Sequence, residues 1–259
     1  MKPPPMLVLY VPSLDRRRLA PDVTPFLCRC LAHFPVVELS THPSVELLPS
    51  LVTGVWPHEH RTWQVQLRPP RTRTVLQRMV DALPDRATTA LQCVWHRFHP
   101  EFDLPTVEPC RRRRFEMHRL KTLRRHGGGL HEADFGGCPT LFSAIGGGRH
   151  RTVFSLADVP QGLAPGLDAA CPLDLLEFYA LDLFSHWNLD RPDAMRDMLR
   201  ETDRLLAHAV GHALSLGLRT LLVVDHGQEQ VRQTIDLTGV LARAGVPRDE
   251  YSFFIEITN

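Results

Sequence analysis

The chain has 259 residues, of which 43 % are hydrophobic, and a formal net charge of +1 at pH 7. This length suits one α/β domain with an insertion, or two small domains, and the apolar content is too high for a disordered chain. The near-zero net charge argues against a nucleic-acid partner, which a strongly basic domain would favour.

Cysteine usage and the N-terminal segment favour a cytoplasmic protein with no membrane partner. The Cys28-x-Cys30 pair has no second pair at zinc-finger spacing, and scattered thiols in a chain of this length are by default reduced. The apolar run at 6–12 is too short for a signal peptide or a membrane span. The six cysteines are Cys28, Cys30, Cys93, Cys110, Cys138 and Cys171.

Apolar runs and helical spacing predict the elements of the N-terminal third. Short runs at 6–12 and 36–40 predict two strands. Residues 24–34 predict a helix, and so does the segment 44–52, in which Pro49 occupies the first turn or causes a kink. Gly54 is expected to end that second helix.

The middle of the chain is less regular than its two ends. We expect a helix at 74–82, a strand at 88–95 and a strand at 151–155. Two glycine runs, at 127–129 and 146–148, lack the GxGxxG spacing of a nucleotide-binding loop and predict flexible loops. The arginine run at 111–114 predicts a solvated charged surface, with contact to an anionic substrate as the alternative.

The final third carries the strongest pattern. An apolar run at 173–181 ends at Asp182, helical spacing covers 192–216, and a strand at 220–224 leads into Asp225-His226-Gly227. Alternation of short apolar runs with helical periods predicts an α/β fold with a mostly parallel sheet flanked by helices. We expect the core to be formed by 1–64 and 151–259, with 65–150 as a cap-like insertion that adds some core elements.

Three segments place metal-binding or nucleophilic side chains at the ends of predicted elements. They are Ser13-Leu14-Asp15, the segment with Ser44, and Asp182 and His186 together with Asp225-His226-Gly227. Carboxylates and imidazoles bind zinc and similar ions, and Asp-x-x-x-His spacing brings both side chains to one helical face. Each piece alone has an ordinary interpretation as a surface pair, a turn or a helix cap. Their order and strand context together favour a metal site.

The order of these motifs resembles the type I phosphodiesterase and nucleotide pyrophosphatase branch of the alkaline phosphatase superfamily. Members have an Asp-Gly after the first strand, a Thr-Pro-Asn-Leu-like helix, and a nucleophile before Leu-Val-Thr-Gly-x-x-Pro-x-x-His-Gly. Later they carry Leu-Asp-x-x-x-His and Val-x-Asp-His-Gly. The similarity covers 6–60 and 175–257, where the matching segments are Leu14-Asp15, Thr24-Pro25-Phe26-Leu27, His42-Pro43-Ser44, Leu51-Val52-Thr53-Gly54-Val55-Trp56-Pro57-His58-Glu59-His60, Leu181-Asp182 to His186, and Val223-Val224-Asp225-His226-Gly227.

The resemblance implies an alkaline phosphatase-like fold and two divalent metal ions, with zinc as the expected metal. One ion would be held by Asp15, Asp225 and His226. The second would be held by Asp182, His186 and a later histidine. Ser44, where the family more often has threonine, matches the nucleophile, and its oxygen would also be a metal ligand.

The sequence departs from the family pattern at three places. Arg16 and Arg61 replace glycines, and residues 228–259 contain no histidine to complete the second metal site. Truncation at the C-terminus, a split gene or a degenerate site would each produce this, and a partner chain is one candidate source of the ligand. His58 and His60 lie nearer, in a stretch to which the family pattern gives a structural role.

The sequence therefore predicts a metal-dependent phosphodiesterase or pyrophosphatase that uses Ser44 on a small phosphoester or nucleotide-like substrate. One alternative is a non-catalytic family member that binds a ligand or a partner protein. Another is a phosphomonoesterase or phosphotransferase of the same fold. A sulfatase is disfavoured, because Ser44-Val45-Glu46-Leu47-Leu48 lacks the Cys/Ser-x-Pro-x-Arg pattern.

Overall fold

A computed structural model divides the chain into two compact units, one of 1–64 with 124–230 and one of 65–123 with 231–259. All candidate site residues belong to the first unit. Ser44 and Thr41 lie outside the described residues. The structure describes residues 4–39, 47–62, 66–67, 83–84, 87, 90, 94, 121–122, 130, 132–153, 156, 167–230, 232–233, 235–247 and 250.

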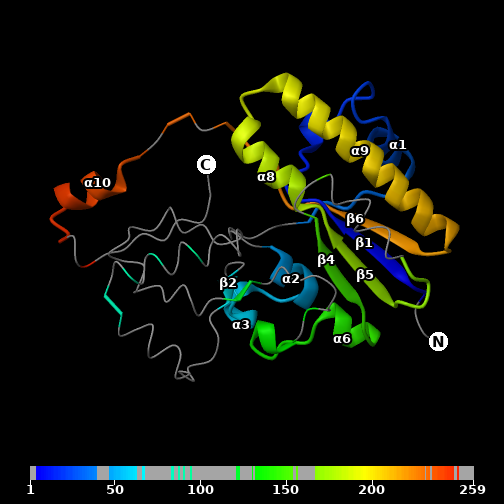
Figure 1. Cartoon of the computed structure of the whole chain (residues 1–259), viewed down its shortest axis with the longest axis horizontal. Coiled ribbons are helices and arrows are strands. Elements are labelled where there is room, and N and C mark those ends of the chain that lie inside the picture. Colours follow the sequence, from blue (N-terminus) through cyan, green and yellow to red (C-terminus); the bar gives the residue numbers. More distant parts are fainter. Residues whose placement is uncertain are drawn as a thin grey trace. The chain divides into compact units, whose positions relative to one another are not determined.

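The first unit contains a four-stranded sheet in which every strand pair is parallel. The strand order is β4-β5-β1-β6, so the first strand of the chain is an inner strand of the sheet (Figure 1). This confirms the predicted α/β fold with a mostly parallel sheet and flanking helices. The strands are β1 (Met6–Tyr10), β4 (Arg149–Thr152), β5 (Leu173–Glu177) and β6 (Arg219–Val223).

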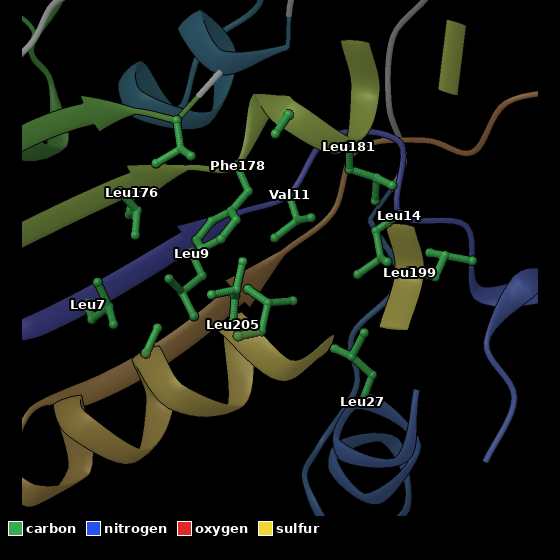
Figure 2. Packing of buried hydrophobic residues seen from close by; sticks show 14 of the residues in the cluster. Leu7, Leu9, Val11, Leu14, Leu27, Leu176, Phe178, Leu181, Leu199 and Leu205 are labelled. Atoms are coloured by element: carbon green, nitrogen blue, oxygen red, sulfur yellow. The ribbon is translucent and has the colours of Figure 1, made fainter. Parts of the chain in front are cut away.

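Three helices cover one face of this sheet, namely α1 (Pro25–His33), α8 (Tyr179–Asn188) and α9 (Pro192–Ser215) (Figure 1). Alternate residues of a strand point to the same face, and Leu7 and Leu9 of β1 both belong to the core under α9. Figure 2 shows Leu9, Phe178 and Leu205 meeting between the strands and α9. This packing fixes the starting points of the loops that follow β1 and β5.

Short helices form the other side of the unit (Figure 1). They are α2 (Leu48–Thr53), α3 (Pro57–His60), the 3₁₀ helix η5 (Glu132–Phe135) and α6 (Leu141–Ile145), and a further 3₁₀ helix, η1 (Arg16–Arg18), follows β1. Pro49 lies in the first turn of α2, and Gly54 ends that helix with φ 70°. In the second unit the structure describes α10 (Leu237–Arg243) and an antiparallel pair of β2 (Gln66–Leu67) with β3 (Lys121–Thr122).

Most of the testable element predictions agree with the structure, and two are wrong. The helices predicted at 24–34 and 192–216 are α1 and α9, and the strand predicted at 220–224 is β6, one residue earlier. The strand predicted at 36–40 is absent over 36–39, because that segment pairs with no described strand and its apolar side chains are exposed. Within the strand predicted at 88–95, Ala90 and Val94 are helical instead.

The strand predicted at 151–155 is β4, which begins two residues earlier, and the helix predicted at 74–82 lies outside the described residues. No helix in the described part of the chain is both long and apolar enough to cross a membrane.

Candidate functional site

The predicted site residues follow the carboxyl ends of three adjacent strands. Asp15 follows β1, the Asp182–His186 pair lies on α8 after β5, and the segment 225–228 follows β6. Because parallel strands end at the same edge of a sheet, their loops meet there. Hydrogen bonds connect all three loops.

Asp182 is buried in the middle of the site, with its two carboxylate oxygens in different surroundings. Oδ1 accepts hydrogen bonds from the hydroxyl of Ser13 and, at 3.0 Å, from Nε2 of Gln228. Oδ2 lies 3.6 Å from Nε2 of His186, which confirms that the i, i+4 pair shares one helical face. Burial opposes ionisation of Asp182, but the hydrogen bonds from His186 and Ser13 outweigh it and lower the pKa overall.

Asp225 has a similar arrangement after β6, and its side chain is 6 % exposed. Oδ1 accepts the backbone N–H of Ser13 at 3.0 Å, and Oδ2 accepts the hydroxyl of Tyr10 at 2.7 Å. Oδ2 also lies 3.4 Å from Nε2 of His226. Burial raises the pKa of Asp225 despite these partners. Ionising this carboxylate in the folded protein therefore costs free energy.

Asp15 is held by Arg17, two residues further along the chain. Arg17 donates from Nε and Nη2 to both carboxylate oxygens, at 3.0, 3.1 and 2.7 Å, and its backbone N–H donates to Oδ1. These bonds lower the pKa of Asp15, with the side-chain bond from Arg17 as the largest cause. Arg17 also pairs with Glu229 at 2.6 Å, so it links the loop after β1 to the loop after β6.

Gly227 is required by the close approach of these two loops. A Cβ atom at this position would lie 2.5 Å from Oδ2 of Asp15, which is closer than non-bonded atoms approach. The glycine of the Asp-His-Gly motif therefore makes room for the carboxylate of Asp15.

His60 has a structural role in the packing of the short helices. Its ring is fully buried, and Nδ1 accepts the backbone N–H of Thr62 at 3.1 Å. Nε2 therefore carries the proton and donates to Oγ of Ser50 at 2.9 Å, which joins α3 to α2. Arg61 adopts a left-handed conformation with φ 59°.

The donor chemistry of the site suits a divalent cation, and the ligands are present as pairs. Asp182 with His186, and Asp225 with His226, each combine a carboxylate with an imidazole, as zinc sites do. Nδ1 of His186 is buried and has no hydrogen-bond partner among the described residues. Within the part of the chain that the structure describes, no three His, Cys, Asp or Glu residues gather closely enough to hold a metal ion.

Four residues of the site received no role from sequence reasoning: Tyr10, Ser13, Arg17 and Gln228. Tyr10, Ser13 and Gln228 contact the carboxylates of Asp182 and Asp225 from distant positions in the chain, so no local pattern reveals them. Arg17 contacts Asp15 nearby and Glu229 far along the chain. Ser13 and Gln228 do lie next to recognised motifs, and their polar side chains at strand ends are the signal that was available. A scan of protein-family models finds no match to this sequence, and a search of curated proteins finds no similar sequence.

Proposed function

We propose that the protein is a metal-dependent phosphoester hydrolase with an alkaline phosphatase-like core, most similar to phosphodiesterases and nucleotide pyrophosphatases. The observation that carries this proposal is that two carboxylate–imidazole pairs and Asp15 follow the carboxyl ends of three adjacent strands of a parallel sheet. The order of the motifs along the chain supports the same assignment. The expected substrate is a small phosphoester or a nucleotide-like molecule.

The proposed metal ligands divide between two positions. Asp15, Asp225 and His226 would hold one cation, and Asp182 and His186 would contribute to the second, with a further ligand from elsewhere. Divalent cations bound there would neutralise phosphoryl oxygens and lower the pKa of a coordinated hydroxyl. Hydrogen bonds from Ser13 orient the buried carboxylates of Asp182 and Asp225, which supports binding of a cation there.

Ser44 is the proposed nucleophile. Its Oγ would form a bond to phosphorus as the bond from phosphorus to the leaving oxygen breaks, which gives a phosphoseryl enzyme and a free alcohol or nucleotide. Water would then attack the same phosphorus and release Ser44. Ser44 loses its hydroxyl proton on attack as the leaving oxygen takes up a proton, and the attacking water loses a proton as the released Ser44 oxygen takes one up.

Metal content and turnover measured on the same sample test this function. Elemental analysis after dialysis against Zn²⁺ or Mn²⁺ should find bound metal. Asp225→Asn should abolish binding of the cation that is assigned to Asp15, Asp225 and His226. Hydrolysis of bis(p-nitrophenyl) phosphate should depend on that metal and stop in Ser44→Ala, while the metal content of Ser44→Ala stays largely intact. Full activity in Ser44→Ala would transfer the nucleophilic role to another group, with Thr41 the nearest candidate.

The second candidate function is a non-catalytic protein that binds a ligand or a partner. Two observations favour it: the described ligands form pairs rather than groups of three, and Arg17 already neutralises Asp15. Firm metal binding without turnover of either bis(p-nitrophenyl) phosphate or p-nitrophenyl phosphate would support this function. Turnover of the monoester alone would point to a phosphomonoesterase.

A further inference from the structure

Ser13 occupies an unusual position at the end of β1. It has φ 62°, and Arg61 is the only other non-glycine residue with positive φ in the described part of the chain. Glycine adopts this left-handed region without strain, whereas a residue with a Cβ does not. A serine that is buried and strained at the edge of a functional site indicates a role for its side chain.

Both hydrogen-bond donors of Ser13 contact proposed metal ligands, and the two ligands belong to different metal positions. The hydroxyl donates to Oδ1 of Asp182, and the backbone N–H donates to Oδ1 of Asp225 at 3.0 Å. A single residue therefore joins the loops that follow β5 and β6.

The two hydrogen bonds reach the same oxygen, Oδ1, of each carboxylate. Oδ2 faces an imidazole at 3.6 Å in Asp182 and at 3.4 Å in Asp225, where it also accepts the hydroxyl of Tyr10 at 2.7 Å. Hydrogen bonds to a metal-binding carboxylate fix its orientation and strengthen binding. The Oδ2 oxygens are thereby turned toward Nε2 of His186 and of His226.

We propose that Ser13 is a positioning residue that couples the two metal positions by orienting the carboxylates of Asp182 and Asp225 together. This inference rests on the proposed metal-dependent function. It makes Ser13 dispensable for the fold and necessary for the geometry of the site.

Replacement by glycine separates these two roles. Ser13→Gly keeps the backbone N–H that serves Asp225, removes the hydroxyl that serves Asp182, and relieves the left-handed strain. The metal-free variant should keep or raise its melting temperature. Its affinity for Co²⁺ should fall by about tenfold or more, and the visible absorption spectrum of the bound Co²⁺ should change, because the ligand geometry changes.

Ser185→Ala is the matched control, because it removes another buried serine hydroxyl beside Asp182. The Ser185 hydroxyl donates to the backbone carbonyl of Asp182 at 2.9 Å and does not touch the carboxylate. The control should keep the Co²⁺ spectrum and affinity of the unmodified protein. Gln228→Leu removes the second donor to Oδ1 of Asp182. It should change the Co²⁺ spectrum and lower the Co²⁺ affinity in the same way as Ser13→Gly, and it gives a second measurement if Ser13→Gly does not fold.

The outcomes separate the inference from the function on which it rests. If the unmodified protein binds Co²⁺ and Asp182→Asn or Asp225→Asn weakens that binding, the metal site stands. An unchanged spectrum and affinity in both Ser13→Gly and Gln228→Leu would then overturn the positioning role alone. If the unmodified protein binds no Co²⁺, the proposed function and this inference both fail. They also fail if Asp182→Asn and Asp225→Asn both bind Co²⁺ as tightly as the unmodified protein does.

Discussion

Asp203 of α9 caps the start of α1, and its removal should cost substantial stability. Its Oδ2 and Oδ1 atoms accept the backbone N–H groups of Phe26 and Leu27 at 3.1 and 2.8 Å, while Thr24 makes no side-chain cap. Hydrogen bonds to a charged acceptor contribute about 1.5–3 kcal/mol each. Because Asp203 is only 4 % exposed, water replaces these bonds poorly. We expect Asp203→Ala to lower the free energy of unfolding by about 3 kcal/mol, less than the simple sum because the two bonds share one carboxylate.

Urea unfolding followed by far-UV circular dichroism measures this loss as a fall in the transition midpoint. Asp203→Asn, which keeps one acceptor oxygen, should lose roughly half as much. The control is Asp197→Ala on the same helix, because Asp197 is exposed and pairs only with Arg200 among the described residues; its effect should stay within about 0.5 kcal/mol. A loss below about 1 kcal/mol in Asp203→Ala would refute the capping argument, since the N–H groups of Phe26 and Leu27 would then have lost their acceptor with little effect on stability.

Three further predictions concern the site. Arg17→Gln should raise the affinity for Zn²⁺ in calorimetric titration relative to Arg16→Gln, which removes the same charge from outside the site; equal affinities would show that Arg17 does not compete for Asp15. Gly227→Ala should weaken the same binding severalfold, because its Cβ displaces the Asp15 carboxylate; unaltered binding would contradict this. In metal-free protein, the lowered pKa of Asp15 contributes stability that is lost as pH falls, whereas the raised pKa of Asp225 contributes stability that is lost as pH rises. The check is the melting temperature of each variant relative to the unmodified protein, measured from acid to neutral pH. As pH rises, this difference should become less favourable for Asp15→Asn and more favourable for Asp225→Asn. The same trend in both variants would disprove the assignment.

Local patterns predicted the elements whose determinants lie within one segment. The apolar spacing of α9 and the apolar strand β6 are such cases, and so is the Asp182–His186 pair, because one helical turn brings its side chains together. Asp225 and His226 were predictable as site residues because they follow the apolar strand β6 in the sequence. A parallel sheet places the residues after its strands at one edge.

The predictions failed where partners distant in the chain decide the outcome. β4 reads Arg-His-Arg-Thr, which is not an apolar strand, and its start was predicted two residues late. Arg149 and Arg151 are accommodated because both pair with Asp174 of β5 at 2.8 Å. The segment 36–39 shows the reverse case: it is mostly apolar and was predicted as a strand, but it pairs with no described strand. The contacts of Ser13 with Asp182 and Asp225 likewise span most of the chain.

The inner position of β1 has a consequence for how the protein is made. β1 pairs with β5 and β6, so Met6 lies opposite Leu173 on one side and Arg219 on the other. During synthesis β1 must therefore wait for the much later strand β5 before either of its edges is paired. Folds dominated by such distant contacts form slowly, and their unpaired strands are open to aggregation meanwhile. Efficient production should therefore depend on chaperones that shield β1 until β5 and β6 have been made.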